Sequence, residues 1–182
     1  MFLFVVVAII ILILATIATY NSFIKKRYMI KEAWSGIDIQ LRRRYDLIPN
    51  LIRTVQGYAK HEKKIFEEVS AARTRAIEGQ GIQQQRDAEN TLSGTLRNLF
   101  AVAENYPELK ANQNFLELQQ NLAAIENDIQ LARRYYNGTV RDFNILVDSF
   151  PSSIIAKFFD FKAEEFFEID LAIARETPEV KF

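Results

Sequence analysis

The sequence predicts an all-α protein, with an N-terminal transmembrane helix followed by an antiparallel up-and-down four-helix bundle and a short Phe-rich C-terminal segment. First, no charged residue occurs from Met1 to Ile24. Second, the apolar residues that follow recur at steps of three and four, the pattern of one face of a helix. Third, only 6 Gly and 4 Pro occur in 182 residues, and abundant Ala, Leu, Gln, Glu and Arg favour helix.

The predicted membrane anchor is the segment 1–24. About 20 apolar residues span a hydrocarbon core of roughly 30 Å, and Phe2 to Ala18 is almost entirely Phe, Leu, Val, Ile and Ala. A cleaved signal peptide would carry basic residues before its apolar run; none precedes this one, although Thr16-Ile17-Ala18 weakly resembles a cleavage site. We therefore expect a retained anchor. Its representative residues are Phe2, Val5, Ile9, Leu12 and Ile17.

The orientation of the anchor is predicted by four basic residues that follow it, namely Lys25, Lys26, Arg27 and Lys31. Basic residues beside a span remain in the cytoplasm. We therefore expect a single-pass protein of the inner membrane, with its N-terminus outside and its helical bundle in the cytoplasm. The alternative is that these charges belong only to a solvated helix face.

The predicted bundle, residues 25–150, begins with an apolar stripe that includes Trp34, Ile37 and Leu41. Pro49 would lose a hydrogen bond and clash inside a helix. With Asp46 as N-cap, Pro49 would instead lie in the first turn of a new helix, so we expect a break there. A kinked continuous helix is the alternative, because the stripe stays in phase past Pro49.

Three more helices are expected. The first ends near Ala76 or Glu78, before the loop Gly79-Gln-Gly81. The second ends at Asn105-Tyr106-Pro107. The third runs from Asn112 to Ser149, where Pro151 stops it. The residues that we expect to be buried between helices are Trp34, Leu51, Val55, Leu96, Leu122, Ile125 and Ile129.

The Phe-rich segment, residues 151–170, is a candidate interface together with the residue before it. Six of the 14 Phe lie here. They are Phe150, Phe158, Phe159, Phe161, Phe166 and Phe167. An even number of bundle helices would return the chain to the membrane. There the rings would either plug the end of the bundle or lie against the bilayer or a neighbouring copy, since exposed apolar patches mark interaction sites. Residues 171–182 are expected to form a loose tail.

A polar network is also expected between the helices. Three successive residues, Arg42 to Arg44, cannot all face one way on a helix, so at least one turns toward a neighbour. Buried charges need partners, and ion pairs between Glu126 or Glu62 and Arg73 or Arg133 would fix the helix register. The candidate members are Arg44, Glu62, Arg73, Glu126, Arg133 and Asn137.

The sequence contains no recognisable catalytic, metal or cofactor motif. His61 is the one histidine, and the H-E-x-x-H zinc motif fails because position 65 is Ile. No Cys occurs, and the 23 basic residues balance 23 acidic ones, which argues against a nucleic-acid-binding protein. We therefore expect no enzyme activity and no cofactor.

Five motifs occur in order along the chain. They are Glu32-Ala-Trp-Ser, Arg44-Tyr-Asp-Leu-Ile-Pro-Asn-Leu, Ala103-Glu-Asn-Tyr-Pro, Ala132-Arg-Arg-Tyr-Tyr-Asn and Phe150-Pro-Ser. With other short matches from about Asn21 to Phe167 they resemble the LemA family, and the run that begins at Arg44 is quite specific by itself. The resemblance implies an N-terminally anchored bacterial protein with a cytoplasmic antiparallel four-helix bundle and no established enzyme activity. Members often occur beside membrane proteases or small membrane-associated partners.

Two functions fit the sequence. The favoured one is a membrane-anchored scaffold or adaptor that assembles at the bilayer with itself or with an unknown membrane protein, because a stripe of coiled-coil type extends from the anchor. The alternative is an accessory regulator or stress sensor of a membrane enzyme such as a protease.

Overall fold

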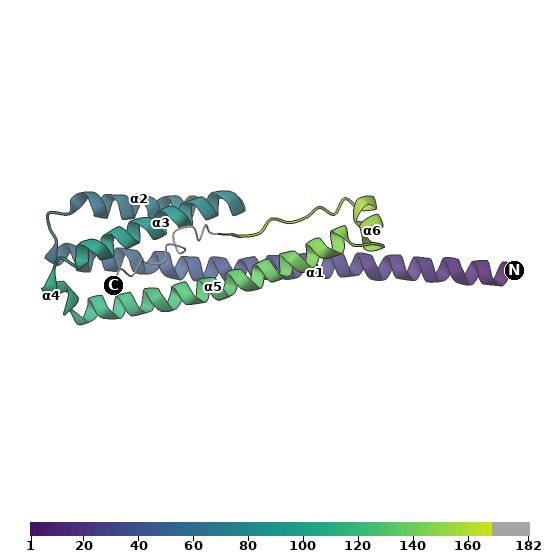
Figure 1. The fold of residues 1–182 in the computed structure, drawn as a ribbon, viewed down its shortest axis with the longest axis horizontal. Helices are drawn as coiled ribbons and strands as arrows, with labels where there is room; N and C mark the ends of the chain where they lie inside the picture. The colour runs from purple at the N-terminus through teal and green to yellow at the C-terminus, as the bar shows by residue number, and fades with distance from the viewer. Residues whose placement is uncertain (169–182) are drawn as a thin grey trace, which may run out of the picture. The chain divides into compact units, whose positions relative to one another are not determined.

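The structure is a computed structural model that describes residues 1–168. It confirms an all-α protein with a long apolar N-terminal helix; no strand occurs in the described residues (Figure 1). The helices are α1 (Phe2–Tyr58), α2 (Lys63–Glu78), α3 (Gly81–Ala103), α4 (Pro107–Lys110), α5 (Gln113–Asp148) and α6 (Ser152–Phe158). The predicted tail, residues 171–182, lies outside the described residues.

The chain forms two compact units. The first unit combines residues 1–39 with residues 130–166, and the second combines residues 40–129 with residues 167 and 168. Helices α1 and α5 each contribute residues to both units.

The predicted break at Pro49 is wrong, because α1 continues through it to Tyr58. Pro49 has no N–H, so the carbonyl of Tyr45, one turn earlier, lacks its intrahelical donor. Arg73 in α2 supplies the missing hydrogen bond: its Nε donates to the Tyr45 carbonyl oxygen at 2.7 Å. A contact from a neighbouring helix therefore allows the helix to continue.

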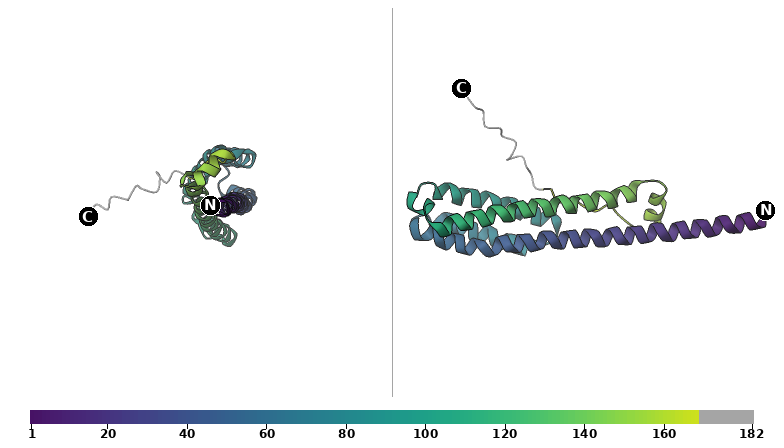
Figure 2. Two further views of the ribbon diagram at one scale, coloured as in Figure 1. Left: turned by 90° about the vertical axis from the view of Figure 1, so that its right-hand side faces the viewer. Right: turned by 90° about the horizontal axis from the view of Figure 1, so that it is seen from below.

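The core of the second unit lies between the end of α1, α2, α3 and the start of α5, which run side by side (Figures 1 and 2). Leu51 and Val55 from α1 are fully buried, and so are Leu92 and Leu99 from α3. Of the predicted core residues in this unit, all are buried: Leu51, Val55, Leu96, Leu122, Ile125 and Ile129. The apolar stripes therefore identified the buried faces of these helices correctly.

The first unit pairs the earlier part of α1 with the later part of α5. Lys26 Nζ lies 3.7 Å from Asp142 Oδ2, and the rings of Trp34 and Tyr136 lie 5.5 Å apart. Residue numbers rise along α1 as they fall along α5, so the two helices run in opposite directions in this unit. Trp34 itself is only half-buried. The buried α1 residues of this unit are Phe23, Ile30, Ala33 and Ile37. Their steps of seven, three and four are those of a coiled-coil heptad.

The start of α1 is the apolar segment that the sequence predicts to be an anchor. Among the helices of residues 1–168, α1 is the one long and apolar enough to cross a membrane; its most apolar window has a mean hydropathy of 3.1 and no buried residue. The predicted anchor residues are all exposed, Phe2 at 84% and Leu12 at 69%. None of residues 25–168 covers this apolar surface.

Candidate functional site

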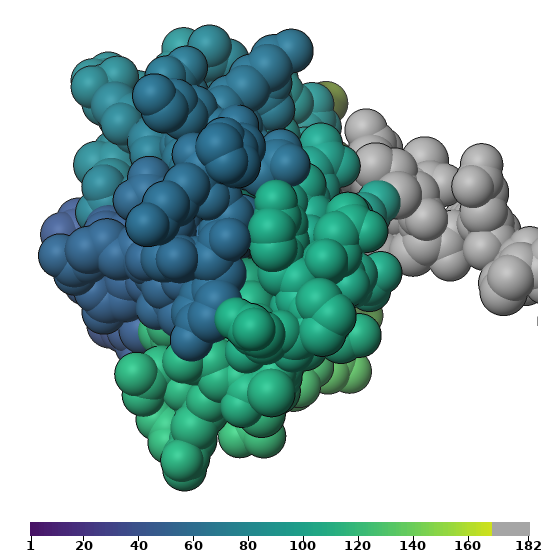
Figure 3. Space-filling model, turned by 90° about the vertical axis from the view of Figure 1, so that its left-hand side faces the viewer, coloured from purple at the N-terminus to yellow at the C-terminus, as the bar shows by residue number. Residues whose placement is uncertain are grey.

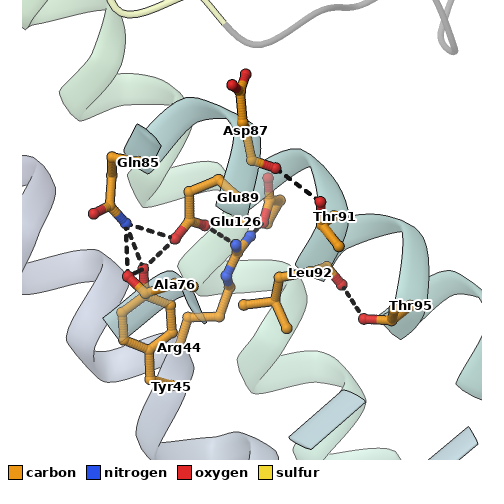
Figure 4. A network of polar contacts seen from close by, with 10 residues as sticks. All are labelled: Arg44, Tyr45, Ala76, Gln85, Asp87, Glu89, Thr91, Leu92, Thr95 and Glu126. Atoms are coloured by element: carbon orange, nitrogen blue, oxygen red, sulfur yellow. Dashed lines mark hydrogen bonds and ion pairs between the residues drawn. The ribbon is translucent and has the colours of Figure 1, made fainter. Parts of the chain in front are cut away.

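A buried polar cluster occupies the core of the second unit (Figure 4). We define it by Arg44 and Tyr45 from α1, Gln85 and Glu89 from α3, and Glu126 from α5. The Arg44 guanidinium donates to the Glu89 carboxylate through Nη2 and to Glu126 Oε2 through Nη1, the latter at 2.8 Å. The Tyr45 hydroxyl donates to the other Glu89 oxygen. Three helices are therefore connected by one guanidinium and two carboxylates.

Gln85, one turn before Glu89 on α3, completes the polar cluster. Its Nε2 lies 3.0 Å from Glu89 Oε1, 2.9 Å from the Tyr45 hydroxyl and 3.1 Å from the carbonyl oxygen of Ala76 in α2. The amide thus links α3 to the end of α2. Gly79, between these helices, has little spare room: a Cβ on it would lie 2.9 Å from Gln85 Oε1.

The electrostatics of the polar cluster are dominated by burial. Glu89 is 0% exposed and Arg44 is 3% exposed. Burial raises the pKa of the Glu89 carboxyl, although Arg44 and the donors from Tyr45 and Gln85 oppose that shift. Burial and the neighbouring Glu89 also raise the pKa of Tyr45. The polar cluster fixes the register between the helices, because a shift of one helix along another would leave a buried charge unpaired.

The structure brings together two predicted network members, Arg44 and Glu126. Glu126 pairs with Arg44 and not with Arg73. Glu62 is half-buried at the residue before α2. Arg133 and Asn137 lie on α5 within the first unit, where both are half-buried.

Sequence reasoning missed Gln85 and Glu89. A signal was available in the sequence. These two polar residues precede the apolar stripe of α3 and continue its helical spacing toward the N-terminus of the helix. The positions that form this stripe, all buried, are Gln85, Glu89, Leu92, Leu96 and Leu99. A glutamate and a glutamine in register with core leucines indicate a buried polar network rather than a solvated turn.

Surface hollows in the second unit do not reach the polar cluster. One lies between α1 and α5 beside Asn50 and Asn114, and another lies between α2 and α3 beside Arg75 and Asp87. Figure 3 views this unit from its end, where residues of α1, α2, α3 and the start of α5 lie beside one another. His61 is exposed, and no group of three His, Asp or Glu in residues 1–168 is placed to hold a metal ion.

The first unit has a cluster of aromatic rings in its core, where the second unit has the polar cluster. Phe161 stacks on Phe23 with ring centroids 4.5 Å apart and planes at 9°, and Phe143 meets Phe23 edge-on at 5.8 Å. Tyr20 lies 4.8 Å from Phe159 and 5.8 Å from Phe161. The Phe-rich segment is thereby attached to α1 immediately after its apolar part.

The chain reversal after α6 explains which rings turn inward. Asp160 has φ 54°, a left-handed conformation that Asp tolerates better than most residues. The Phe161 N–H donates to the Ala156 carbonyl at 2.9 Å, the longer bond of a Schellman motif. This turn ends α6 and directs Phe161 against Phe23.

The segment after the reversal is fixed to α5 by side chains. The Asn144 amide bonds to both sides of the Glu164 backbone: its Nδ2 donates to the carbonyl oxygen at 2.9 Å and its Oδ1 accepts from the N–H at 2.8 Å. The Tyr136 hydroxyl donates to the Glu165 carbonyl at 3.0 Å, and burial raises the Tyr136 pKa to about 12. The Phe-rich segment is thus attached at both α1 and α5.

The six candidate-interface rings divide into two groups. Phe161 and Phe167 are buried. Phe150 and Phe158 are 82% and 81% exposed, whereas Phe159 and Phe166 are 44% and 40% exposed.

The four basic residues after the apolar segment have different surroundings. Lys25 is exposed, and Lys26 pairs with Asp142. The Arg27 guanidinium carbon lies 5.8 Å from the Phe161 ring centre, and Lys31 Nζ lies 5.5 Å from that of Tyr28. Both distances fall within the range of cation–π attraction.

These features define the class of the protein: a helical protein whose N-terminal helix is apolar enough to cross a membrane and whose later helices surround a buried ionic core. The chain belongs to the LemA family, whose family model matches residues 33–182. The matched range contains the whole polar cluster and the Phe-rich segment.

Curated relatives agree with this class. The chain is 24% identical to magnetosome protein MamQ 2 of Paramagnetospirillum magneticum over 86% of its own length and 68% of that protein. It is 22% identical to magnetosome protein MamQ of Magnetospirillum gryphiswaldense, over 81% of this chain and 64% of that one. It is also 22% identical to protein LemA of Metamycoplasma hominis, over 83% and 72%. The family, these relatives and the apolar helix indicate a membrane-associated helical protein.

Proposed function

We propose that this protein is a non-enzymatic scaffold that assembles with copies of itself at the inner membrane of a bacterium. Its N-terminus would lie outside, and the second unit would lie in the cytoplasm as an antiparallel four-helix bundle. The observation that carries the proposal is the continuity of α1, which runs from Phe2 to Tyr58 without a break. One helix therefore holds both an uncovered apolar segment and the core residues Leu51 and Val55.

The four-helix arrangement is supported by the polar cluster. Arg44 on α1 contacts Glu89 on α3 and Glu126 on α5, while Gln85 contacts the end of α2. A bundle in up-and-down order needs only short connections, and residues 59–62 and 79–80 are short connections of this kind.

Self-assembly is supported by an uncovered apolar stripe on α5 within the first unit. Leu131, Tyr135 and Ile145 are exposed by 55%, 52% and 55%. At 100° per residue, the three positions fall within about 80° of one another around the helix. Exposed apolar residues gathered on one face are typical of protein–protein contacts, so a second copy could pair its α5 with this stripe.

The mass of the full-length protein in mild detergent, measured by light scattering, tests this proposal. We expect a complex of several copies that dissociates when Leu131→Gln and Tyr135→Gln are combined. Gln130→Ala, an exposed substitution on the same helix at about 100° or more from Leu131 and Tyr135 around it, is the control and should leave the mass unchanged. A single-copy wild-type protein would contradict self-assembly. Single copies that co-purify with one stoichiometric membrane enzyme would support a regulator of that enzyme instead.

A further inference from the structure

Helix α6 and the turn before it present an apolar ridge that the rest of the first unit leaves uncovered. On α6, Ile154 and Phe158 are 60% and 81% exposed and lie one turn apart, and Phe150, in the turn that precedes the helix, is 82% exposed. The opposite side of α6 is buried through Ser152 and Ala156. The short helix therefore has one face against the unit and one apolar face directed outward.

The ridge lies at a defined level along α1. Phe159, next to the ridge residue Phe158, contacts Tyr20 at 4.8 Å, and Phe161 stacks on Phe23 at 4.5 Å. Twenty helical residues span about 30 Å, the thickness of the hydrocarbon core. If residues 1–20 fill that core, then Tyr20 and Phe23 lie at its edge, where aromatic rings gather.

We propose that α6 is a second membrane contact, in which Phe150, Ile154 and Phe158 insert into the lipid interface beside the α1 anchor. This inference rests on the proposed anchoring of α1. It adds that lipid covers the exposed apolar face of α6. The apolar surface of α1 is uncovered up to Ile17, which is 51% exposed. The ridge therefore adjoins a surface that lipid already covers once α1 is inserted.

The charges around the ridge also fit a lipid surface. Lys157 is exposed in the last turn of α6, Lys25 is exposed on α1 five residues after Tyr20, and the exposed Asp160 after α6 is paired with Lys162 at 3.3 Å. Short helices with bulky apolar residues on one face and basic residues beside it lie in the plane of the interface, where the basic residues attract anionic headgroups. The return helix α5 would then be held at the bilayer by α6, so that both long helices are positioned by the membrane.

Site-specific fluorescence can test this directly, because the chain contains no Cys. Phe158→Cys and Ile154→Cys, made separately in the full-length protein, would each be labelled with an environment-sensitive dye. The labelled proteins would be reconstituted into vesicles of phosphatidylcholine and phosphatidylglycerol. A nitroxide attached either high or low on the acyl chain of added lipid would then quench the dye according to its depth. Leu12→Cys is the control for anchor insertion, and the exposed Glu67→Cys in α2 is the control for a position in water.

We expect dyes at positions 154 and 158 to show blue-shifted emission and stronger quenching by the shallow nitroxide than by the deep one. The dye at position 12 should show the opposite order, and the dye at position 67 should be quenched by neither. If positions 154 and 158 behave like position 67 while position 12 is quenched, α1 is an anchor and the α6 proposal is wrong. If position 12 is also unquenched, the anchoring itself fails. Dyes at 154 and 158 that are blue-shifted but unquenched by lipid would mean that a protein surface covers the ridge, which also overturns the proposal.

Discussion

At the scale of single residues, Pro49 and Arg73 act as a pair. The proline removes a donor from α1, and the arginine in α2 replaces it at 2.7 Å from the Tyr45 carbonyl oxygen. Tyr45 is 5% exposed, so water can do little to substitute for the arginine. A buried acceptor left without a partner costs about 1–3 kcal/mol.

We expect Arg73→Met to lower the free energy of unfolding by about 1–3 kcal/mol. The same change should cost much less in a Pro49→Ala background, where residue 49 regains its N–H and satisfies the Tyr45 carbonyl. A double-mutant cycle measured by urea unfolding of the detergent-solubilised protein checks this coupling. Arg75→Met, an exposed change in the same helix, is the control. Equal costs of Arg73→Met in both backgrounds would show that the two residues are independent.

Glu89 gives the second prediction at this scale, and it concerns pH. Burial raises the pKa of its carboxyl above the ordinary value of 4.5, so the folded state binds the proton more tightly than the unfolded state. The stability contributed by this protonation is fully present below pH 4.5 and is lost as the pH rises through the raised pKa. Wild type should therefore lose stability relative to Glu89→Gln over that interval.

The urea midpoints of wild type and Glu89→Gln, compared from about pH 4 to about pH 8, measure this difference. The titratable groups around Glu89 are Arg44 and Tyr45 on α1 and Glu126 on α5. Gln85→Ala removes a donor that holds the Glu89 pKa down, so it should move the loss of stability to higher pH. A difference between wild type and Glu89→Gln that stays constant with pH would mean that burial does not control the proton on Glu89.

At the scale of helices, local signals predicted most boundaries. The loop at Gly79 to Gly81 and the stops at Pro107 and Pro151 lie where the sequence placed them, because glycine and proline act on their own neighbours in the chain. Gly81 indeed has φ 78°, a conformation that favours glycine. The break predicted at Pro49 failed because the compensating donor lies in another helix. The position of Glu89, in phase with the α3 leucines, did indicate burial, but its partners Arg44, Tyr45 and Glu126 come from other helices and are not marked in its local sequence.

The Phe-rich segment contains both buried and exposed Phe rings. Phe161 is 8% exposed and touches the rings of Phe23, Phe143 and Tyr20. We expect Phe161→Ala to cost about 3–5 kcal/mol, as for other buried Phe. Phe158→Ala, at an exposed ring of the same segment, should stay within about 0.5 kcal/mol in detergent. Thermal unfolding followed by circular dichroism compares them; equal losses would mean that the reversal after α6 does not separate the rings as described.

At the scale of the whole molecule, the apolar start of α1 is the feature that indicates attachment to a membrane. The LemA family match begins at residue 33, after the predicted anchor. The membrane segment is therefore inferred from the sequence and exposure of residues 1–24, and not from that match. Its exposed side chains have no protein partner among the described residues, and under the proposed function lipid covers them.

The proposed orientation rests on the charges after this segment. Lys25 and three more basic residues stand within the next seven positions, and moving them across the membrane opposes the bias that retains Lys and Arg in the cytoplasm. In intact cells, a dye that cannot cross membranes should therefore fail to label Glu67→Cys in α2 and should label it after the cells are opened. Phe2→Cys, at the other end of α1, should be labelled in intact cells. Replacing Lys25, Lys26, Arg27 and Lys31 by Gln should allow a fraction of molecules to insert in the reverse direction, so that Glu67→Cys becomes reactive from outside. Labelling of Glu67→Cys in intact cells with the basic residues in place would reverse the proposed topology and put the polar cluster on the outer side of the membrane.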